Sequence, residues 1–182
     1  MDFTAEEIID YWYSPEISRQ WFASTAQLDA EIKTKYETLW QTAAGGELDH
    51  WQASPQGCLA LIIILDQFPL NMYRNRPESF STEAKSIEIA RHAVEKRFDR
   101  VLPQQQKAFL YMPFMHSEKL PDQDLSVKLF TEAGLKENQH FAEHHRELIR
   151  RFGRFPHRNK ILNRKSTPEE IDYLNSEKAF KG

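Results

Sequence analysis

The sequence is poor in the features that mark several common protein classes. It contains a single cysteine, Cys58, which excludes an internal disulfide and favours a reducing compartment. Its longest apolar run, from Cys58 to Leu65, is far too short to cross a bilayer, so no membrane partner is expected. The N-terminus is acidic and lacks the basic region of a signal peptide. We therefore expect a cytoplasmic protein.

Motifs of several enzyme classes are also missing. The chain has no glycine-rich dinucleotide loop, no Walker phosphate loop, no GxSxG elbow and no CxxC pair. Glu137 and His140 form one half of a di-iron carboxylate motif, and His144 follows His140 at helical spacing, but no second half exists. We therefore expect neither a metal site nor a bound cofactor.

Charge is unevenly distributed along the chain. The whole chain of 182 residues carries a net charge of −3 and is long enough for one domain, which we place at residues 1–182. Residues 146–165 hold eight lysines and arginines against one acid, a local charge of +7 that leaves −10 for the rest. This pattern argues against a broad nucleic-acid surface. It fits a focused anion site or a basic strip neutralised by acids folded against it.

Hydrophobic periodicity and capping signals predict helices almost everywhere. Thr4 and Glu7 match a capping box, and Ser54-Pro55 is a typical helix start. The apolar segment that follows Pro55 is compatible with a buried strand, but no second strand-like segment exists to pair with it, so helix is favoured. Pro69 is expected to close this helix. Further helices are predicted near residues 4–13, 25–44, 82–98, 103–113, 121–134 and 136–152, with a last short helix after 167.

Short links between these helices favour an all-α fold built as an array of helical hairpins, either a solenoid-like superhelix or a bundle. No repeat of fixed length is present in the sequence.

The basic strip ends a predicted helix and continues into a turn. Arg146 and Arg150 lie one helical turn apart, and Arg154 and Arg158 follow in the turn. Arginine binds carboxylate or phosphate with two parallel hydrogen bonds, so this choice over lysine indicates a defined anion site. The alternative is a set of structural salt bridges at a helix C-terminus, where cations are also favoured. The predicted ligand-binding residues of the strip are Arg146, Arg150, Arg154, His157, Arg158 and Asn159.

Three titratable side chains are candidates for acid–base chemistry. His145 falls on the apolar face of its helix, where it is either a hydrogen-bonded core histidine or a general base. His116 and Glu118 follow a proline-containing helix, where they either line a pocket or belong to an ordinary loop. Glu118 is either an acid or base or a second anchor for an arginine. Asp66 ends the most apolar helix, so its carboxylate needs a compensating group, which we predict to be an arginine. Arg74 and Arg76 are near it in sequence and complete the predicted ligand-binding set.

Four segments resemble the bacterial domain-of-unknown-function family 924. They are LDQFPLNMYRNRP at 65–77, ARHAVEKRFD at 90–99, FLYMPFMHSE at 109–118 and HRELIRRFGRFPHRNKILNRKSTPEE at 145–170. The resemblance implies an all-α fold similar to the tetratricopeptide-like superfamily, and it implies no reaction. Leu70 departs from the family pattern, in which a basic residue follows the proline, so a role for position 70 in anion binding is in doubt.

These observations leave three hypotheses for function. The first is a pocket for a small phosphate- or carboxylate-bearing ligand, lined by arginine and histidine. The second is an adaptor that binds an acidic peptide or protein, as helical arrays often do. The third is an RNA-binding protein that uses arginine with Phe152 and Phe155, which the net negative charge disfavours. Whether the protein is an enzyme is left open by the sequence.

Overall fold

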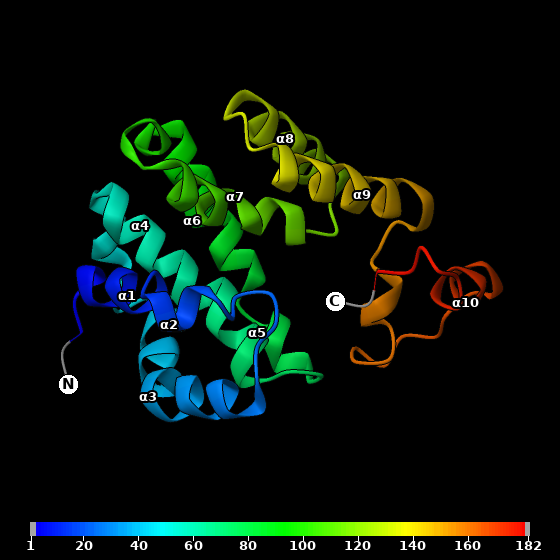
Figure 1. The fold of residues 1–182 in the computed structure, drawn as a ribbon, viewed down its shortest axis with the longest axis horizontal. Helices are drawn as coiled ribbons and strands as arrows, with labels where there is room; N and C mark the ends of the chain where they lie inside the picture. The colour runs from blue at the N-terminus through cyan, green and yellow to red at the C-terminus, as the bar shows by residue number, and fades with distance from the viewer. Residues whose placement is uncertain (1–2, 181–182) are drawn as a thin grey trace.

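The computed structural model describes residues 3–180, and these residues form helices joined by short links (Figure 1). No strand occurs in this range, so the predicted all-α class is confirmed. Both ends of the predicted domain, residues 1–2 and 181–182, lie outside the described range. The α-helices are α1 (Ala5–Trp12), α2 (Pro15–Ser18), α3 (Ala26–Ala44), α4 (Pro55–Ile62), α5 (Phe68–Met72), α6 (Glu83–Glu95), α7 (Gln104–His116), α8 (Leu120–Glu132), α9 (Lys136–Phe152) and α10 (Pro168–Leu174), with 3-10 turns at Asp49–Ala53, Pro77–Phe80, Phe98–Val101 and Pro156–Arg158 and a π-helical turn at Ile63–Gln67.

Local capping explains where several helices begin. At α1, Thr4 Oγ1 accepts from the Glu7 backbone N–H at 3.2 Å, and the Glu7 carboxylate accepts from the Thr4 N–H at 2.8 Å. Thr167 and Glu170 repeat this capping box at the start of α10. Ser54 caps α4 through its side-chain oxygen, as predicted. Each cap satisfies backbone donors that a helix start leaves without partners.

The apolar segment after Pro55 is a helix that lies at the centre of the fold, and the strand alternative is wrong. Helix α4 continues through the π-helical turn into α5, so Pro69 does not end it as predicted. Proline has no N–H to donate to the carbonyl of Leu65, four residues earlier. The Thr82 hydroxyl donates to that carbonyl instead, at 2.6 Å. The side chain of Thr82, the residue before α6, therefore satisfies this carbonyl and allows the helical backbone to continue beyond Pro69.

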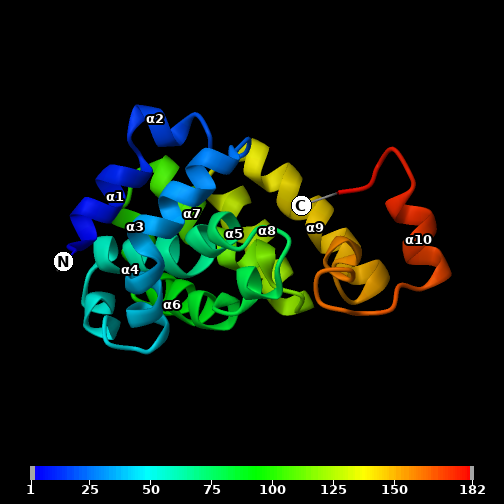
Figure 2. The ribbon, with the colours of Figure 1, turned by 90° about the horizontal axis from the view of Figure 1, so that it is seen from below.

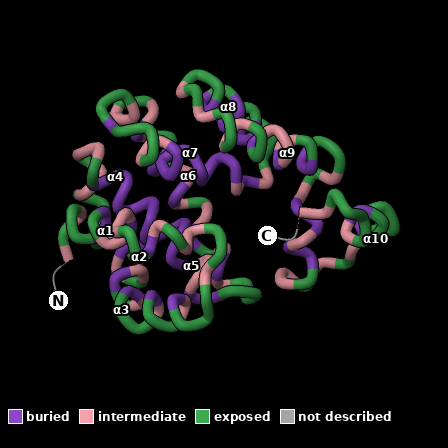
Figure 3. The backbone as a smooth tube through the Cα atoms, viewed as in Figure 1, coloured by how far each residue is buried: buried purple, intermediate pink, exposed green. Residues whose placement is uncertain are grey.

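Around this central helix, aromatic rings build the main apolar core. Tyr36 stacks on Phe68 with ring centroids 4.7 Å apart, and Trp12 meets Phe109 edge-on at 5.6 Å. Buried residues accordingly concentrate on α4, α5 and α7 (Figure 3). No helix within residues 3–180 has the length and apolar character needed to span a bilayer.

Helices α6 to α9 pack as successive neighbours, with α8 and α9 side by side (Figures 1 and 2). Pro113 lies inside α7 without ending it. Gly134, with a φ of 69°, makes the turn between α8 and α9, a backbone conformation in which a Cβ atom would cause strain. Helix α9 buries His145 as predicted, whereas Phe141, one helical turn earlier, is 47% exposed.

Residues 153–180 form a C-terminal arm that extends from the end of α9 (Figure 2). We call residues 3–152 the helical body. Gly153 ends α9 in the left-handed conformation with a φ of 70°, and the chain turns there. The arm shares a small apolar cluster with the end of α9, separate from the main core, which includes Leu148, Phe155 and Tyr173. Its attachment to the body therefore depends on polar contacts as well as apolar ones. A right-handed superhelical arrangement of the hairpins stays a prediction.

Candidate functional site at the C-terminal arm

Asp66 lies in the π-helical turn, and its side chain is only 3% exposed. It accepts a hydrogen bond from His116 Nδ1 at 3.0 Å and a second one from the side-chain amide of Gln67. Within residues 3–180 it pairs with no arginine, so the predicted Asp66–arginine pair is wrong. The buried carboxylate does have a compensating group, as expected, but that group is His116. The π-helical turn directs the Asp66 side chain toward the end of α7, where His116 lies.

His116 combines a fixed orientation with partial access to solvent. Burial alone would lower the pKa of its imidazole, but the charge and hydrogen bond of Asp66 outweigh burial and raise the pKa above its ordinary value. Because Nδ1 is engaged with Asp66, Nε2 is the nitrogen that can meet a ligand. The side chain is 19% exposed, and Nε2 makes no hydrogen bond to any described residue.

Arg158 is the most buried cation of the basic strip, with a side chain 7% exposed. One terminal nitrogen donates to Glu83 at 2.7 Å, and the other donates to the backbone carbonyl of His116 at 2.8 Å. The guanidinium lies 4.3 Å from the ring centre of Phe80 and 4.7 Å from that of Phe155. These contacts join α6, the end of α7 and the arm. Burial raises the pKa of Glu83, although Arg158 opposes that shift.

Two further histidines lie beside these groups. His145 Nδ1 donates to the Phe141 carbonyl at 2.8 Å, and burial lowers its pKa to about 3. Burial, together with the charge of Arg158, lowers the pKa of His157 to about 4. Both imidazoles are therefore neutral near pH 7. This supports the core-histidine reading of His145 and makes it a poor proton donor.

Glu118 anchors the arm to the body. Its carboxylate accepts from the Phe155 backbone N–H at 2.8 Å and from both terminal nitrogens of Arg164, at 2.7 and 2.9 Å. Burial favours the neutral acid, but these donors prevail and lower the pKa of Glu118. Of the two roles considered for it, this geometry favours an arginine anchor over an acid or base.

Other predicted residues pair within the arm. Arg154 makes a two-pronged ion pair with Glu170, at 2.7 and 2.8 Å. Asn159 donates to Glu170 and to Ser166, each at 3.1 Å. The Arg154 bond, helped by the Thr167 N–H, lowers the pKa of Glu170 to about 2. These contacts hold the turn around α10 together.

The remaining predicted arginines lie apart from His116 and bind carboxylates nearer to them. Arg146 and Arg150 both contact Asp124 at 3.4 Å. Arg74 pairs with Asp29 at 2.7 Å, and Arg76 pairs with Glu78 at 2.6 Å. The basic strip is thus largely neutralised by acids folded against it, one of the two outcomes that its charge predicted.

We call the group of side chains that lie together at the base of the arm the junction site. Sequence reasoning missed two of them, Glu83 and Phe80, which lie in segments without a chemical motif. No group of three or more His, Cys, Asp or Glu side chains suited to a metal ion occurs in the described part of the chain. The junction site consists of Asp66, Phe80, Glu83, His116, His145, Phe155, His157 and Arg158.

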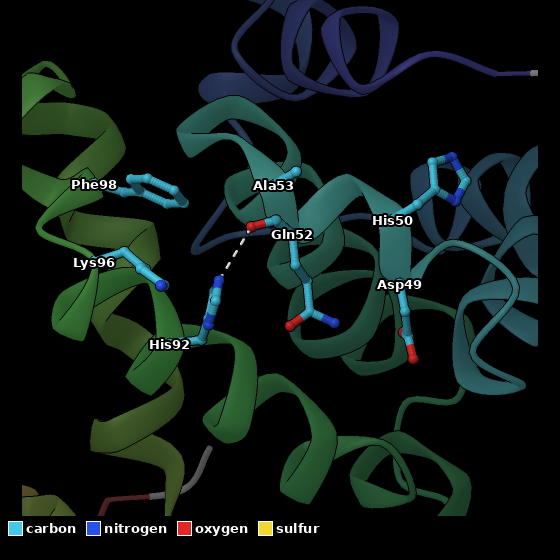
Figure 4. A pocket seen from close by; sticks show the side chains of 7 residues that line it. All are labelled: Asp49, His50, Gln52, Ala53, His92, Lys96 and Phe98. Atoms are coloured by element: carbon cyan, nitrogen blue, oxygen red, sulfur yellow. Dashed lines mark hydrogen bonds between the residues drawn. The ribbon is translucent and has the colours of Figure 1, made fainter.

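Two surface cavities lie away from Asp66 and His116. One, of about 460 Å³, opens between the 3-10 turn at Asp49–Ala53 and the end of α6, where His92 Nε2 meets the Gln52 carbonyl at 3.1 Å (Figure 4). The other, of about 420 Å³, lies between α9 and α10 beside Tyr173 and Arg151. No residue predicted for the anion site lines either cavity.

A comparison with protein-family models matches residues 8–178 to a family described as "Bacterial protein of unknown function (DUF924)". A search of curated proteins found no match. Among solved structures, a protein of unknown function from Agrobacterium tumefaciens is similar, with 35% sequence identity and a TM-score of 0.88. The match covers 94% of this chain and 96% of that one.

Proposed function

Because this chain belongs to the DUF924 family, whose description includes no activity, its function has to be argued from its own side chains, and we propose that it binds a small phosphate- or carboxylate-bearing ligand at the junction site. The protein would act in the cytoplasm, where its one thiol stays reduced.

The observation that carries this proposal is a pair of buried nitrogens. Arg158 Nε and His157 Nδ1 have no hydrogen-bond partner within residues 3–180. An unsatisfied buried polar atom costs about 1–3 kcal/mol, so such atoms are rare and are often explained by a ligand or an ordered water. These two belong to consecutive residues, and the charge of His116 acts on His157.

The chemistry of these nitrogens suits an anion, because Arg158 Nε–H is a donor and the neutral His157 ring donates from Nδ1 in its Nδ1–H tautomer. Each terminal nitrogen of Arg158 already donates one hydrogen bond, to Glu83 and to a backbone carbonyl, whereas Nε–H is the guanidinium nitrogen without an acceptor in the described residues. His116 adds a second donor, Nε2–H, in its protonated form, which Asp66 favours. Donors at fixed positions suit phosphate or carboxylate oxygens. If the ligand reacts, His116 is the group placed to exchange a proton with it.

A melting assay tests the proposal. The protein is melted with inorganic phosphate, sulfate, acetate or citrate against chloride at equal ionic strength. A ligand at one hundred times its Kd adds about 2.7 kcal/mol of stability, so the melting temperature should rise with the bound anion. Arg158→Lys and His116→Gln should lose that rise. Arg151→Lys, a change at an exposed ion pair, is the matched control and should keep it.

Equal melting temperatures in all these salts would reject the proposal. Neither alternative function gains a specific observation: the pairing of the strip with acids reduces the positive surface that an RNA or an acidic peptide would meet.

A further inference from the structure

Phe180, near the C-terminus, turns back onto the histidines of the junction site. Its ring centre lies 4.6 Å from that of His145 and 5.1 Å from that of His157, in edge-to-face arrangements. His144 lies slightly farther away, at 6.4 Å. A phenyl ring from the chain's own tail therefore fills a slot lined by flat rings.

Few contacts hold this tail in place. The Phe180 backbone N–H donates to the Tyr173 hydroxyl at 2.8 Å, and that hydroxyl donates to the Lys178 carbonyl at 3.3 Å. Residues 175–178, which lead into the tail, are exposed. The Tyr173 hydroxyl, the Phe180 ring and the small apolar contact of Ala179 thus attach the tail, and a segment with so few contacts opens at low free-energy cost.

The slot adjoins the buried nitrogens. Phe155 connects the two, because its ring lies 5.4 Å from that of His145 and 4.7 Å from the Arg158 guanidinium. His157, which contacts Phe180 by its ring, carries one of the two junction-site nitrogens that have no partner among the described residues. A molecule with a ring in the slot would therefore present an attached anionic group to His157 and Arg158.

We propose that Phe180 occupies a ring-binding subsite of the junction site, so that the ligand is an anion carrying a flat aromatic ring and the C-terminal tail moves aside when it binds. This inference rests on the proposed function and adds the ligand class and a covering segment to it. The Phe180 ring competes with the ring of the ligand for this subsite.

Ligand class is tested with phenyl phosphate and methyl phosphate, which share the anion and differ in the ring. Binding by calorimetry is compared in the full chain, in a chain ending at Lys178 and in Phe180→Ala. Without the Phe180 ring, phenyl phosphate should bind at least about tenfold tighter than methyl phosphate, because a buried ring contributes that much. The full chain should bind phenyl phosphate more weakly than either variant does. Phe22→Ala, a change at a phenylalanine 80% exposed, is the matched control and should behave as the full chain.

Whether the C-terminal tail covers His145 and His157 is tested without a ligand. Diethyl pyrocarbonate modifies neutral imidazoles, so its rate at His145 and His157, followed by mass spectrometry, reports access. The rate should rise in the shortened chain and in Tyr173→Phe, which removes both tail hydrogen bonds and keeps the aromatic ring. Circular dichroism melts establish that the variants fold.

Each part of the proposal has its own contrary result. Equal affinities for the two phosphates in the shortened chain would overturn the ring subsite. Equal rates of modification in the full and shortened chains would overturn the proposal that the tail covers His145 and His157. Faster modification together with no binding of either phosphate would reject the anion site itself and support the cover alone.

Discussion

Arg158 connects three segments that are far apart in the sequence. Its guanidinium binds Glu83 on α6 and the carbonyl of His116 at the end of α7, while its own backbone belongs to the arm. Because the side chain is buried, removing it leaves Glu83 and that carbonyl without their donors. A broken buried ion pair costs far more than a broken surface pair.

We predict that Arg158→Ala lowers the free energy of unfolding by about 3–5 kcal/mol, as expected for a buried pair that loses one partner. Urea unfolding followed by circular dichroism measures it. Arg151→Ala removes a pair with Glu169 whose arginine side chain is 47% exposed, and it should change stability by at most about 1 kcal/mol. Equal effects of the two changes would mean that the Glu83 contact contributes little.

Asp66 sets the protonation of His116. In Asp66→Asn the pKa of His116 should fall below its ordinary value, because burial then acts without the opposing carboxylate. An NMR titration of the His116 ring measures it, with Asp124→Asn as the control. A raised histidine pKa contributes stability that is present below the unfolded pKa and is lost as the pH rises through the folded one. The variant should therefore lose more stability near about pH 6 than near about pH 9, whereas a pKa unchanged by the substitution contradicts this account.

Asp66 also contributes to thermal stability through the hydrogen bonds that it accepts. Asp66→Ala should lower the melting temperature clearly, since it leaves His116 Nδ1 and the Gln67 amide without their acceptor. An unchanged melt would mean that the pair with His116 adds nothing to stability.

At the scale of the element, the path from α4 to α5 depends on one hydroxyl. Thr82 donates to the Leu65 carbonyl and accepts from the Trp40 indole at 3.1 Å. Both contacts lie beside the π-helical turn that positions Asp66. The helical path from α4 to α5, which carries Asp66, therefore continues beyond Pro69 because Thr82, on another segment, supplies the missing hydrogen bond.

We predict that Thr82→Val, which keeps the side-chain shape, lowers the free energy of unfolding by about 1–3 kcal/mol, because a buried carbonyl loses its donor. Thr34→Val is the control, since Thr34 is exposed and its hydroxyl bonds only within its own helix. That control should stay within about 0.5 kcal/mol. A similar loss in both variants would trace the effect to helix propensity.

At the scale of the whole molecule, two neutral histidines, the buried His145 and the half-buried His157, link stability to acid. The pKa values of His145 and His157, lowered to about 3 and about 4, mean that the unfolded chain binds protons that the folded chain does not. Their contribution is full above the unfolded pKa near 6.5 and is lost as the pH falls toward the folded values. Stability should therefore fall from about pH 6.5 to about pH 4, by about 1.4 kcal/mol per pH unit for each histidine.

Urea titrations across that range measure the slope. The double variant His145→Gln, His157→Gln should have a flatter profile, while His140→Gln, at an exposed position, should keep the original slope. Below about pH 4.5 the lowered pKa values of Glu118 and Glu170 add a further loss, because protonation of these carboxylates weakens their pairs with Arg164 and Arg154. A flat profile of the unaltered protein down to about pH 4 would contradict the neutral state of the two histidines.

Much of the helical fold follows from local patterns in the sequence. The capping boxes at Thr4 and Thr167 and the start at Ser54 depend on residues three positions apart, so they are readable without a structure. The end predicted at Pro69 was wrong because the hydroxyl that replaces the missing N–H comes from Thr82, distant in sequence. Local signals are decisive only where the interaction is local.

The sequence by itself determined an all-α chain, several of its helix starts and a concentration of arginine that runs from the second half of α9 into the arm, because these depend on residue type and short spacing. Only the tertiary structure decided that Arg158 meets Glu83, that Asp66 pairs with His116 and that Phe180 covers two histidines. Charge attracts without direction, so a run of arginines does not choose among many distant acids. The packing of α6, α7 and the arm makes that choice, since it brings one carboxylate within hydrogen-bonding distance and leaves the others out of reach.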